Sequence, residues 1–77
     1  MQQNYEELYK HEWTQAIKAL QNLLLLTKQH RLHLISNSAD DEELTFFAQA
    51  LFLISKMEQD AMEMFEDIVA EFEMQKY

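Results

Sequence analysis

Residues 36–44 read SNSADDEEL, and they decide how the chain is organised. Serine, asparagine and aspartate favour turns and helix ends, because their short polar side chains bond nearby backbone groups. Asp40, with Glu43 three residues later, has the spacing of a capping box at a helix start. No other run of turn and cap formers of this kind occurs in the chain. The stretch therefore predicts one turn, over about residues 36–40, between two long segments.

Apolar side chains recur every three or four residues on both sides of this turn, which is the period of an amphipathic helix. At roughly 100° per residue they fall on one stripe of each helix. The first stripe consists of Tyr5, Tyr9, Trp13, Ala16, Ile17, Leu20, Leu23, Leu24, Thr27, Leu34 and Ile35. The second consists of Leu44, Phe47, Ala48, Leu51, Ile54, Ala61, Met62, Phe65, Ile68, Val69 and Phe72. The periodicity predicts helices over about 4–35 and 41–75.

A short turn makes two long helices antiparallel neighbours. The predicted fold is therefore all-α: a single helical domain over residues 1–77, built as an antiparallel two-helix hairpin. A turn centred near residue 37 predicts that Tyr9 faces Glu66. A bend within residues 27–33 is the alternative and would give three helices, but the chain has no glycine or proline to favour it.

The chain has 77 residues and contains no cysteine, glycine or proline. A lone core of this size supplies only about 3–5 kcal/mol, and small folds usually add disulfides, a metal or a partner chain. The absence of cysteine excludes disulfides. The absence of glycine excludes phosphate-binding loops, dinucleotide fingerprints and nucleophile elbows, which need backbone conformations that glycine adopts readily. A narrow hairpin also offers no cleft, so we expect a protein that is not an enzyme and assign no catalytic residue.

The N-terminal residues do not resemble a signal peptide, because Glu6 and Glu7 stand where basic residues would be expected. The longest purely apolar run, residues 23–26, is far shorter than the roughly 20 residues that cross a bilayer. We therefore expect a cytoplasmic protein without membrane association.

The net charge of −8 comes from the second half of the chain. Residues 1–38 hold three acidic and four basic residues, whereas residues 39–77 hold eleven acidic and two basic residues. Nucleic-acid binding draws its affinity from clustered lysine and arginine. Direct binding to nucleic acid is therefore not expected, and a basic protein is the expected partner.

Five acidic residues of the second helix form the candidate partner-binding site, which we call the acidic surface: Asp60, Glu63, Glu66, Asp67 and Glu71. One interpretation is that they only solvate the outer side of the helix. The other is that their carboxylates imitate the phosphates of a nucleic acid and occupy a basic groove on a target protein. Small phage-encoded inhibitors work in this way, and the chain resembles them in size and charge.

A second apolar stripe on the second helix lies roughly 90–100° from the first. Together with apolar residues of the first helix, it exceeds what one seam between two helices can cover. The candidate oligomer interface consists of Phe46, Leu53, Met57, Met64 and Leu26. The simplest way to cover it is a homodimer that forms a four-helix bundle, and a bound partner chain is the alternative.

Glu58 lies on the core line of the second helix, where an apolar residue would be expected. One interpretation is a buried polar residue that fixes the register or the oligomeric state by pairing with Trp13, Tyr9 or a partner chain. The other is a carboxylate that contacts a partner or takes part in catalysis. Arg31, on the core line of the first helix, is expected to pair with acidic residues near the turn.

His30 and His33 are three residues apart, but two histidines provide too few ligands for a structural zinc site within one chain. The Glu-x-x-His motif of di-iron bundles is also missing. No metal site and no cofactor are therefore predicted.

Together these features predict a non-enzymatic acidic interaction module, an inhibitor or adaptor that binds a basic protein surface. The alternative is a secretion or assembly chaperone that holds a partner helix in an apolar groove.

Overall fold

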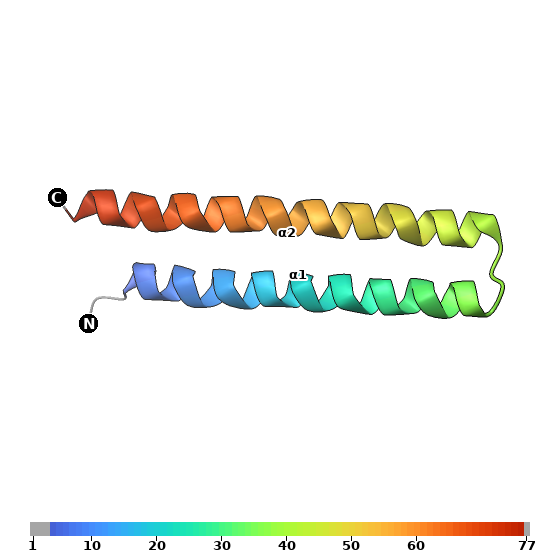
Figure 1. Ribbon diagram of the computed structural model, residues 1–77. Helices are drawn as coiled ribbons and strands as arrows, with labels where there is room; N and C mark the ends of the chain where they lie inside the picture. Colours follow the sequence, from blue (N-terminus) through green and yellow to red (C-terminus); the bar gives the residue numbers. More distant parts are fainter. Residues whose placement is uncertain (1–3, 77) are drawn as a thin grey trace.

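The computed structural model describes residues 4–76 and is an antiparallel pair of long helices (Figure 1). Helix α1 runs over Tyr5–Ser36 and helix α2 over Asp41–Gln75. The Cα trace measures 58 × 21 × 12 Å, so the molecule is a thin rod with the turn at one end and both termini at the other. The predicted all-α hairpin is confirmed, and because α1 continues without interruption, the three-helix alternative is wrong. Residues 1–3 and 77, which the predicted domain includes, lie outside the described residues.

Both helices begin with a side-chain cap. The Oδ1 atom of Asn4 accepts a hydrogen bond from the Glu7 N–H at 3.3 Å, and Oδ1 of Asp40 accepts one from the Glu43 N–H at 2.8 Å. Each bond satisfies a backbone donor that has no partner within its own helix. The cap predicted at Asp40 is therefore confirmed.

The turn closes without glycine. Ser38 adopts a φ of 56°, in the left-handed region that usually favours glycine. The N–H groups of Asn37, Ser38 and Ala39 donate to carbonyl oxygens of the last turn of α1, at 3.0–3.2 Å. These bonds satisfy carbonyl groups at the end of α1 and hold the chain as it reverses.

The seam between the helices follows a strict seven-residue repeat, with alternating spacings of four and three. The α1 seam residues are Glu6, Lys10, Trp13, Ile17, Leu20, Leu24, Thr27, Arg31 and Leu34. The α2 seam residues are Leu44, Phe47, Leu51, Ile54, Glu58, Ala61, Phe65, Ile68 and Phe72. Such a repeat is the pattern of a coiled coil, in which each helix keeps one narrow stripe against its neighbour.

The first helix meets the second in a different register from the one predicted. Tyr5 and Tyr9 are 60 % and 46 % exposed, and Glu6 and Lys10 take the seam positions at this end. The Tyr9 ring lies 5.8 Å from the ring of Phe72, more than a helical turn beyond Glu66. The prediction that Tyr9 faces Glu66 is therefore wrong, because it rested on a turn centred near residue 37, whereas the turn lies between Ser36 and Asp41 and brings later residues of α2 level with Tyr9.

Four other residues of the predicted stripes also lie outside the seam and are exposed: Ala16, Leu23, Ile35 and Met62. The seam is thus narrower than the apolar stripes, which is the origin of the exposed apolar surface described below. Within the described residues, neither helix has a stretch long and apolar enough to cross a membrane.

Candidate interaction surfaces

The hairpin buries very little of its apolar side chains. Among the described residues, Ile54 is the only buried hydrophobic residue and Thr27 the only buried polar one, each 8 % exposed. The accessible surface is 6350 Å². A compact monomer of 9.3 kDa would expose about 5,000 Å², so the hairpin exposes an excess of about 1,400 Å². A typical stable complex covers about 800 Å² on each partner, so the excess is large enough for one interface.

The seam divides the surface of the hairpin into two sides. In each helix, every residue directly before a seam residue lies on one side, and every residue directly after a seam residue lies on the other. In an antiparallel pair, the residues that directly precede seam residues in one helix lie on the same side of the hairpin as those that directly precede seam residues in the other helix. All five candidate interface residues precede a seam residue, so they share this side of the hairpin.

The α2 members of this side are joined by Leu23 and Leu26 from α1, and we call the whole set the apolar surface: Leu23, Leu26, Phe46, Leu53, Met57 and Met64. Phe46, Leu26 and Leu53 are 62 %, 60 % and 57 % exposed. The structure therefore brings the predicted interface residues together across two helices, which the sequence pattern of each helix alone did not show.

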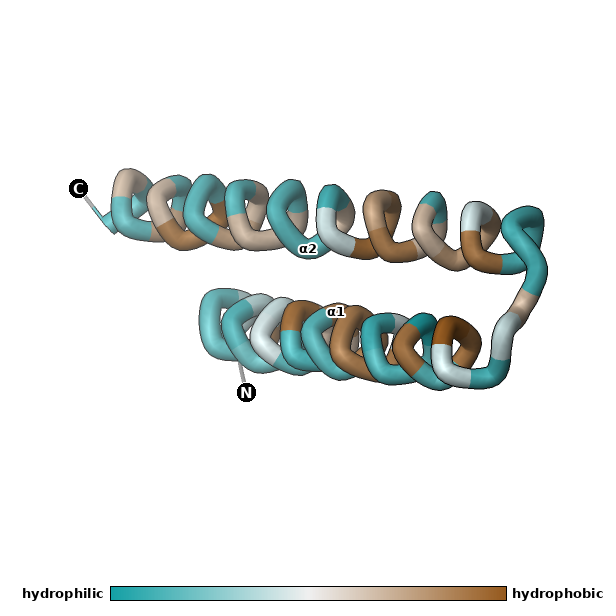
Figure 2. Tube along the Cα trace, turned by 45° about the vertical axis from the view of Figure 1, so that its right-hand side comes forward, coloured by the Kyte–Doolittle hydropathy of each residue, from teal (hydrophilic) through white to brown (hydrophobic). Residues whose placement is uncertain are grey.

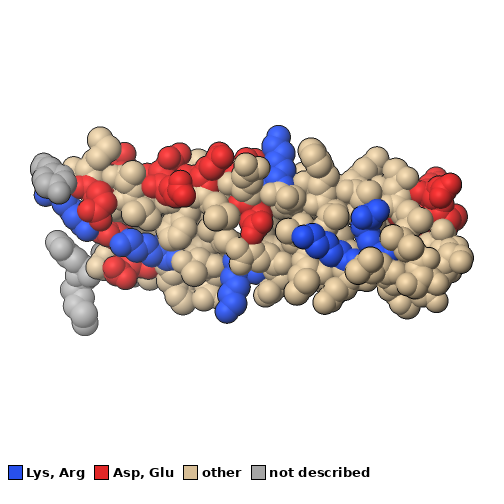
Figure 3. Space-filling model, viewed as in Figure 1, with Lys and Arg blue, Asp and Glu red and all other residues tan. Residues whose placement is uncertain are grey.

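Apolar and acidic residues are separated along the length of the hairpin. Brown apolar segments of α1 lie toward the turn and its N-terminal part is teal (Figure 2). Acidic side chains gather over the C-terminal half of α2 and at the turn, and between them lie uncharged residues and a few lysine or arginine side chains (Figure 3). The half of the hairpin near the turn is thus the more apolar, and the half near the termini is the more acidic.

All five residues of the acidic surface are exposed, but they do not share one side of α2. Asp60, Asp67 and Glu71 precede seam residues and lie on the side of the apolar surface, whereas Glu66 follows a seam residue and Glu63 points outward between the two sides. Within residues 4–76, none of the five forms an ion pair. The acidic surface therefore wraps around α2 with its charge uncompensated by the hairpin.

Glu58 occupies a seam position and is half-buried. No hydrogen bond or ion pair connects its carboxylate to another described residue, and Tyr9, one of its expected partners, lies beside Phe72. A partner for Glu58 within the hairpin is thus not present among the described residues.

Arg31 also occupies the seam, close to the turn, and is half-buried. Its Nε atom is buried without a hydrogen-bond partner, and the structure shows no ion pair between Arg31 and the acidic residues of the turn within its described range. The expected ion pair of Arg31 is therefore not formed.

The histidines near the turn make local packing contacts. The centre of the His30 ring lies 4.5 Å from the centre of the Phe47 ring, with the two rings nearly perpendicular, and His33 lies beside the side-chain amide of Asn37. Over the described part of the chain, no group of three or more histidine, aspartate or glutamate residues is placed to hold a metal ion.

An ion-pair network at the open end of the hairpin was not anticipated from the sequence. The Glu6 carboxylate lies 2.9 Å from Lys10 Nζ and 3.3 Å from Lys76 Nζ, and Lys76 also contacts Glu73 at 3.2 Å. The hydrogen bond from Lys10 lowers the pKa of Glu6, and the bond to Glu73 is the main reason that the pKa of Lys76 is raised. The four-residue spacing of Glu6 and Lys10 is readable in the sequence, but the link across the helices depends on a register that the sequence did not give.

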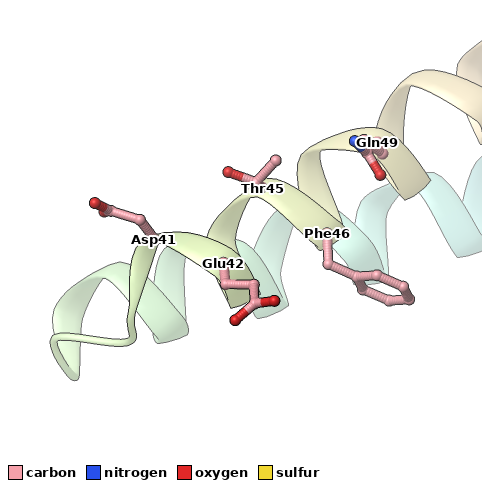
Figure 4. A pocket seen from close by; sticks show the side chains of 5 residues that line it. All are labelled: Asp41, Glu42, Thr45, Phe46 and Gln49. Atoms are coloured by element: carbon pink, nitrogen blue, oxygen red, sulfur yellow. The ribbon is translucent and has the colours of Figure 1, made fainter.

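A shallow hollow on α2 beside the turn is lined by Asp41, Glu42, Thr45, Phe46 and Gln49. In Figure 4, the Asp41 carboxylate and the Phe46 ring point away from each other. These side chains do not converge on a common point, as the polar groups of a small-molecule site do.

No protein family, curated protein or solved structure matches this chain. The apolar surface and the acidic surface are therefore the features from which a function is inferred.

Proposed function

We propose that this chain is a non-enzymatic protein-interaction module. Its apolar surface pairs with a second copy to complete a four-helix bundle, and its acidic surface binds a basic protein, which it inhibits or links to another component. The observation that carries the proposal is the exposure of the six apolar side chains on one side of a hairpin with almost no buried core.

A second copy fits the apolar surface because the surface extends across both helices, and from Phe46 to Met57 its α2 part carries no charged side chain; Asp60 lies between Met57 and Met64. Covering it in a two-fold arrangement would convert two thin rods into a bundle with a shared core. The excess exposed area of about 1,400 Å² is also larger than the roughly 800 Å² that each partner of a standard interface contributes.

A basic protein fits the acidic surface because of the local charge. Eleven acidic and two basic residues lie within residues 39–77, and the described residues pair few of them. Uncompensated carboxylates attract a basic surface during encounter and reject other acidic surfaces. Screening at physiological salt limits this attraction to about 8 Å, so binding of this kind weakens as salt rises.

The test is a pull-down from the native host with the purified chain, followed by binding measurements on the recovered protein. We expect its affinity to fall steeply between low and high salt, and Glu63→Lys with Asp67→Lys to abolish binding while circular dichroism shows unchanged helicity. The control is Glu7→Lys with Glu12→Lys, which changes the net charge equally on α1 and should retain more of the affinity. Equal losses for the two variants would contradict a localised acidic site.

The two methionines of the apolar surface favour one alternative function. Met57 and Met64 are flexible and polarisable, as in grooves that accept helices of different sequence. A chaperone of this kind would hold a partner helix on the apolar surface. Its affinity would be insensitive to salt, and Leu53→Glu would abolish binding while the acidic variants bind normally.

A further inference from the structure

We infer that two copies pair with their turns pointing in opposite directions and overlap only through the halves nearest the turn. The resulting assembly carries its two acidic surfaces at opposite ends, and it can bridge two basic partners. This inference rests on the proposed homodimer and specifies its geometry and its valence.

The position of the apolar surface along the rod sets the centre of the overlap. At 1.5 Å per residue, its six members centre roughly 20–25 Å from the turn. The rod itself extends 58 Å, so the centre lies on the turn side of its midpoint. A two-fold axis through the apolar surface therefore does not pass through the middle of the hairpin.

Pairing with both turns at the same end would superpose like charges. On the side of the apolar surface, the half near the termini carries Glu12, Asp60, Asp67 and Glu71. Among the described residues, no lysine or arginine directly precedes a seam residue, and His30 and His33, which do, lie near the turn, away from these carboxylates. Each carboxylate would meet the acidic end of the second copy, and like charges placed opposite one another repel.

Full overlap with the turns at opposite ends would bury carboxylates. In that arrangement, Asp60 comes level with Met57 of the second copy and Asp67 comes level with its Ala50. Covering a carboxylate with apolar side chains and no hydrogen-bond partner is unfavourable.

An offset that centres the overlap on the apolar surface reduces both problems. The turn of the second copy then lies about 40–50 Å along the rod, so Asp67 comes level with this turn and Glu71 reaches to its end or beyond, and both remain in water, while Leu26, Phe46 and Leu53 are covered. Asp60 is the carboxylate of this side that stays within the overlap. The acidic halves project from opposite ends of the bundle. Two identical acidic sites at a fixed separation are the arrangement of a bivalent linker.

Pulsed electron–electron spin resonance between labelled copies tests this geometry. Because the chain lacks cysteine, a single introduced cysteine carries the label. Ser36→Cys marks the turn end and Ala70→Cys marks the half near the termini; both sites are exposed and outside the apolar surface. From a rise of 1.5 Å per residue and helix axes 8–10 Å apart, we expect distances of about 40 Å for Ser36→Cys and about 55 Å for Ala70→Cys.

Each other outcome overturns the inference in a recognisable way. Two distances below about 30 Å would show both turns at the same end, and a longer distance at Ser36→Cys than at Ala70→Cys would show full overlap. Absence of any dipolar coupling, with a monomer in sedimentation equilibrium, would overturn the proposed homodimer itself. Leu26→Glu, placed in the centre of the overlap, should abolish the coupling while each hairpin remains helical.

Discussion

Replacing Glu58 with leucine tests how a charged residue comes to occupy the seam. Glu58 is half-buried between the apolar seam residues Ile54 and Ala61, and no described residue bonds its carboxylate. Glutamate and leucine have similar helix propensities. Any change in the free energy of unfolding of Glu58→Leu therefore comes mainly from burying an apolar side chain in place of a carboxylate.

The expected stabilisation follows from the extent of burial. Fully burying a leucine side chain contributes about 1.5–3 kcal/mol, so half-burying one in place of a carboxylate contributes roughly 1 kcal/mol. In a domain of 60–100 residues, 1 kcal/mol shifts the melting temperature by about 4–8 °C. We therefore expect Glu58→Leu to raise the melting temperature by about that amount.

Thermal unfolding followed by circular dichroism measures this shift, with Glu63→Leu as the matched control. Glu63 lies five residues after Glu58 on the same helix, and its side chain points outward. Its replacement by leucine should therefore change the melting temperature little. Sedimentation equilibrium on the same samples tests whether Glu58 also specifies the assembly, as single polar core residues do in coiled coils. In that case, Glu58→Leu should give mixed oligomeric states.

A fall in the melting temperature of Glu58→Leu would refute this reasoning, because it would mean that the carboxylate makes a favourable buried pair. A rise with one uniform oligomer would keep the burial argument and remove the role of Glu58 in specifying the assembly. If the uniform variant also lost a partner that wild type binds, Glu58 would belong to the partner-binding site.

Three further changes test individual parts of the hairpin. Ser38→Gly should stabilise the fold by up to about 1 kcal/mol in urea unfolding, because glycine adopts the positive φ at lower cost, and a destabilised variant would show that Ser38 is not strained. Asp40→Ala should destabilise it by about 1 kcal/mol through loss of the cap, whereas Asp41→Ala, which keeps the cap, should have a smaller effect. Glu6→Gln should lower the melting temperature at pH 7, and the difference should disappear in acid. Its lowered pKa means that Glu6 stabilises the fold above the ordinary glutamate pKa of about 4.5, and that this stabilisation is lost as the pH falls through the lower value of the folded state. A difference that persists below pH 2 would contradict the ion-pair assignment.

The helices and the turn could be predicted from the sequence because their signals are local. Asp40 and Glu43 show the cap by their spacing, and the apolar period continues on either side of a single polar run. Helix α2 begins and ends at the residues expected, and α1 begins one residue after its predicted start, because Asn4 acts as the cap.

The register and the pairings across the seam could not be predicted in the same way. They depend on which of several apolar residues at each level faces the other helix, and in α1 the run Leu23–Leu26 offers an apolar residue in every direction. The strict seven-residue repeat selects Leu24 and leaves Leu23 and Leu26 exposed. The same choice places Glu6 and Lys10 in the seam and creates the cross-helix contact of Glu6 with Lys76.

Which side of the hairpin each candidate residue lies on could be determined only once the pairing of the two helices was known. The second apolar stripe of α2 could be recognised from its helical period in the sequence. That it lies on the same side of the hairpin as Leu23 and Leu26 of α1 follows from the antiparallel arrangement. The distribution of Asp60, Glu63 and Glu66 around α2 likewise follows from their positions relative to the seam.

Sedimentation equilibrium of the wild-type chain is the most direct test of the central claim that one hairpin is an incomplete unit. At micromolar concentration, we expect the mass of two copies of the 9.3 kDa chain, with cooperative unfolding whose midpoint rises with concentration. Leu53→Glu should reduce the mass to that of one chain. A wild-type chain that remains monomeric at these concentrations and still unfolds cooperatively would contradict the claim.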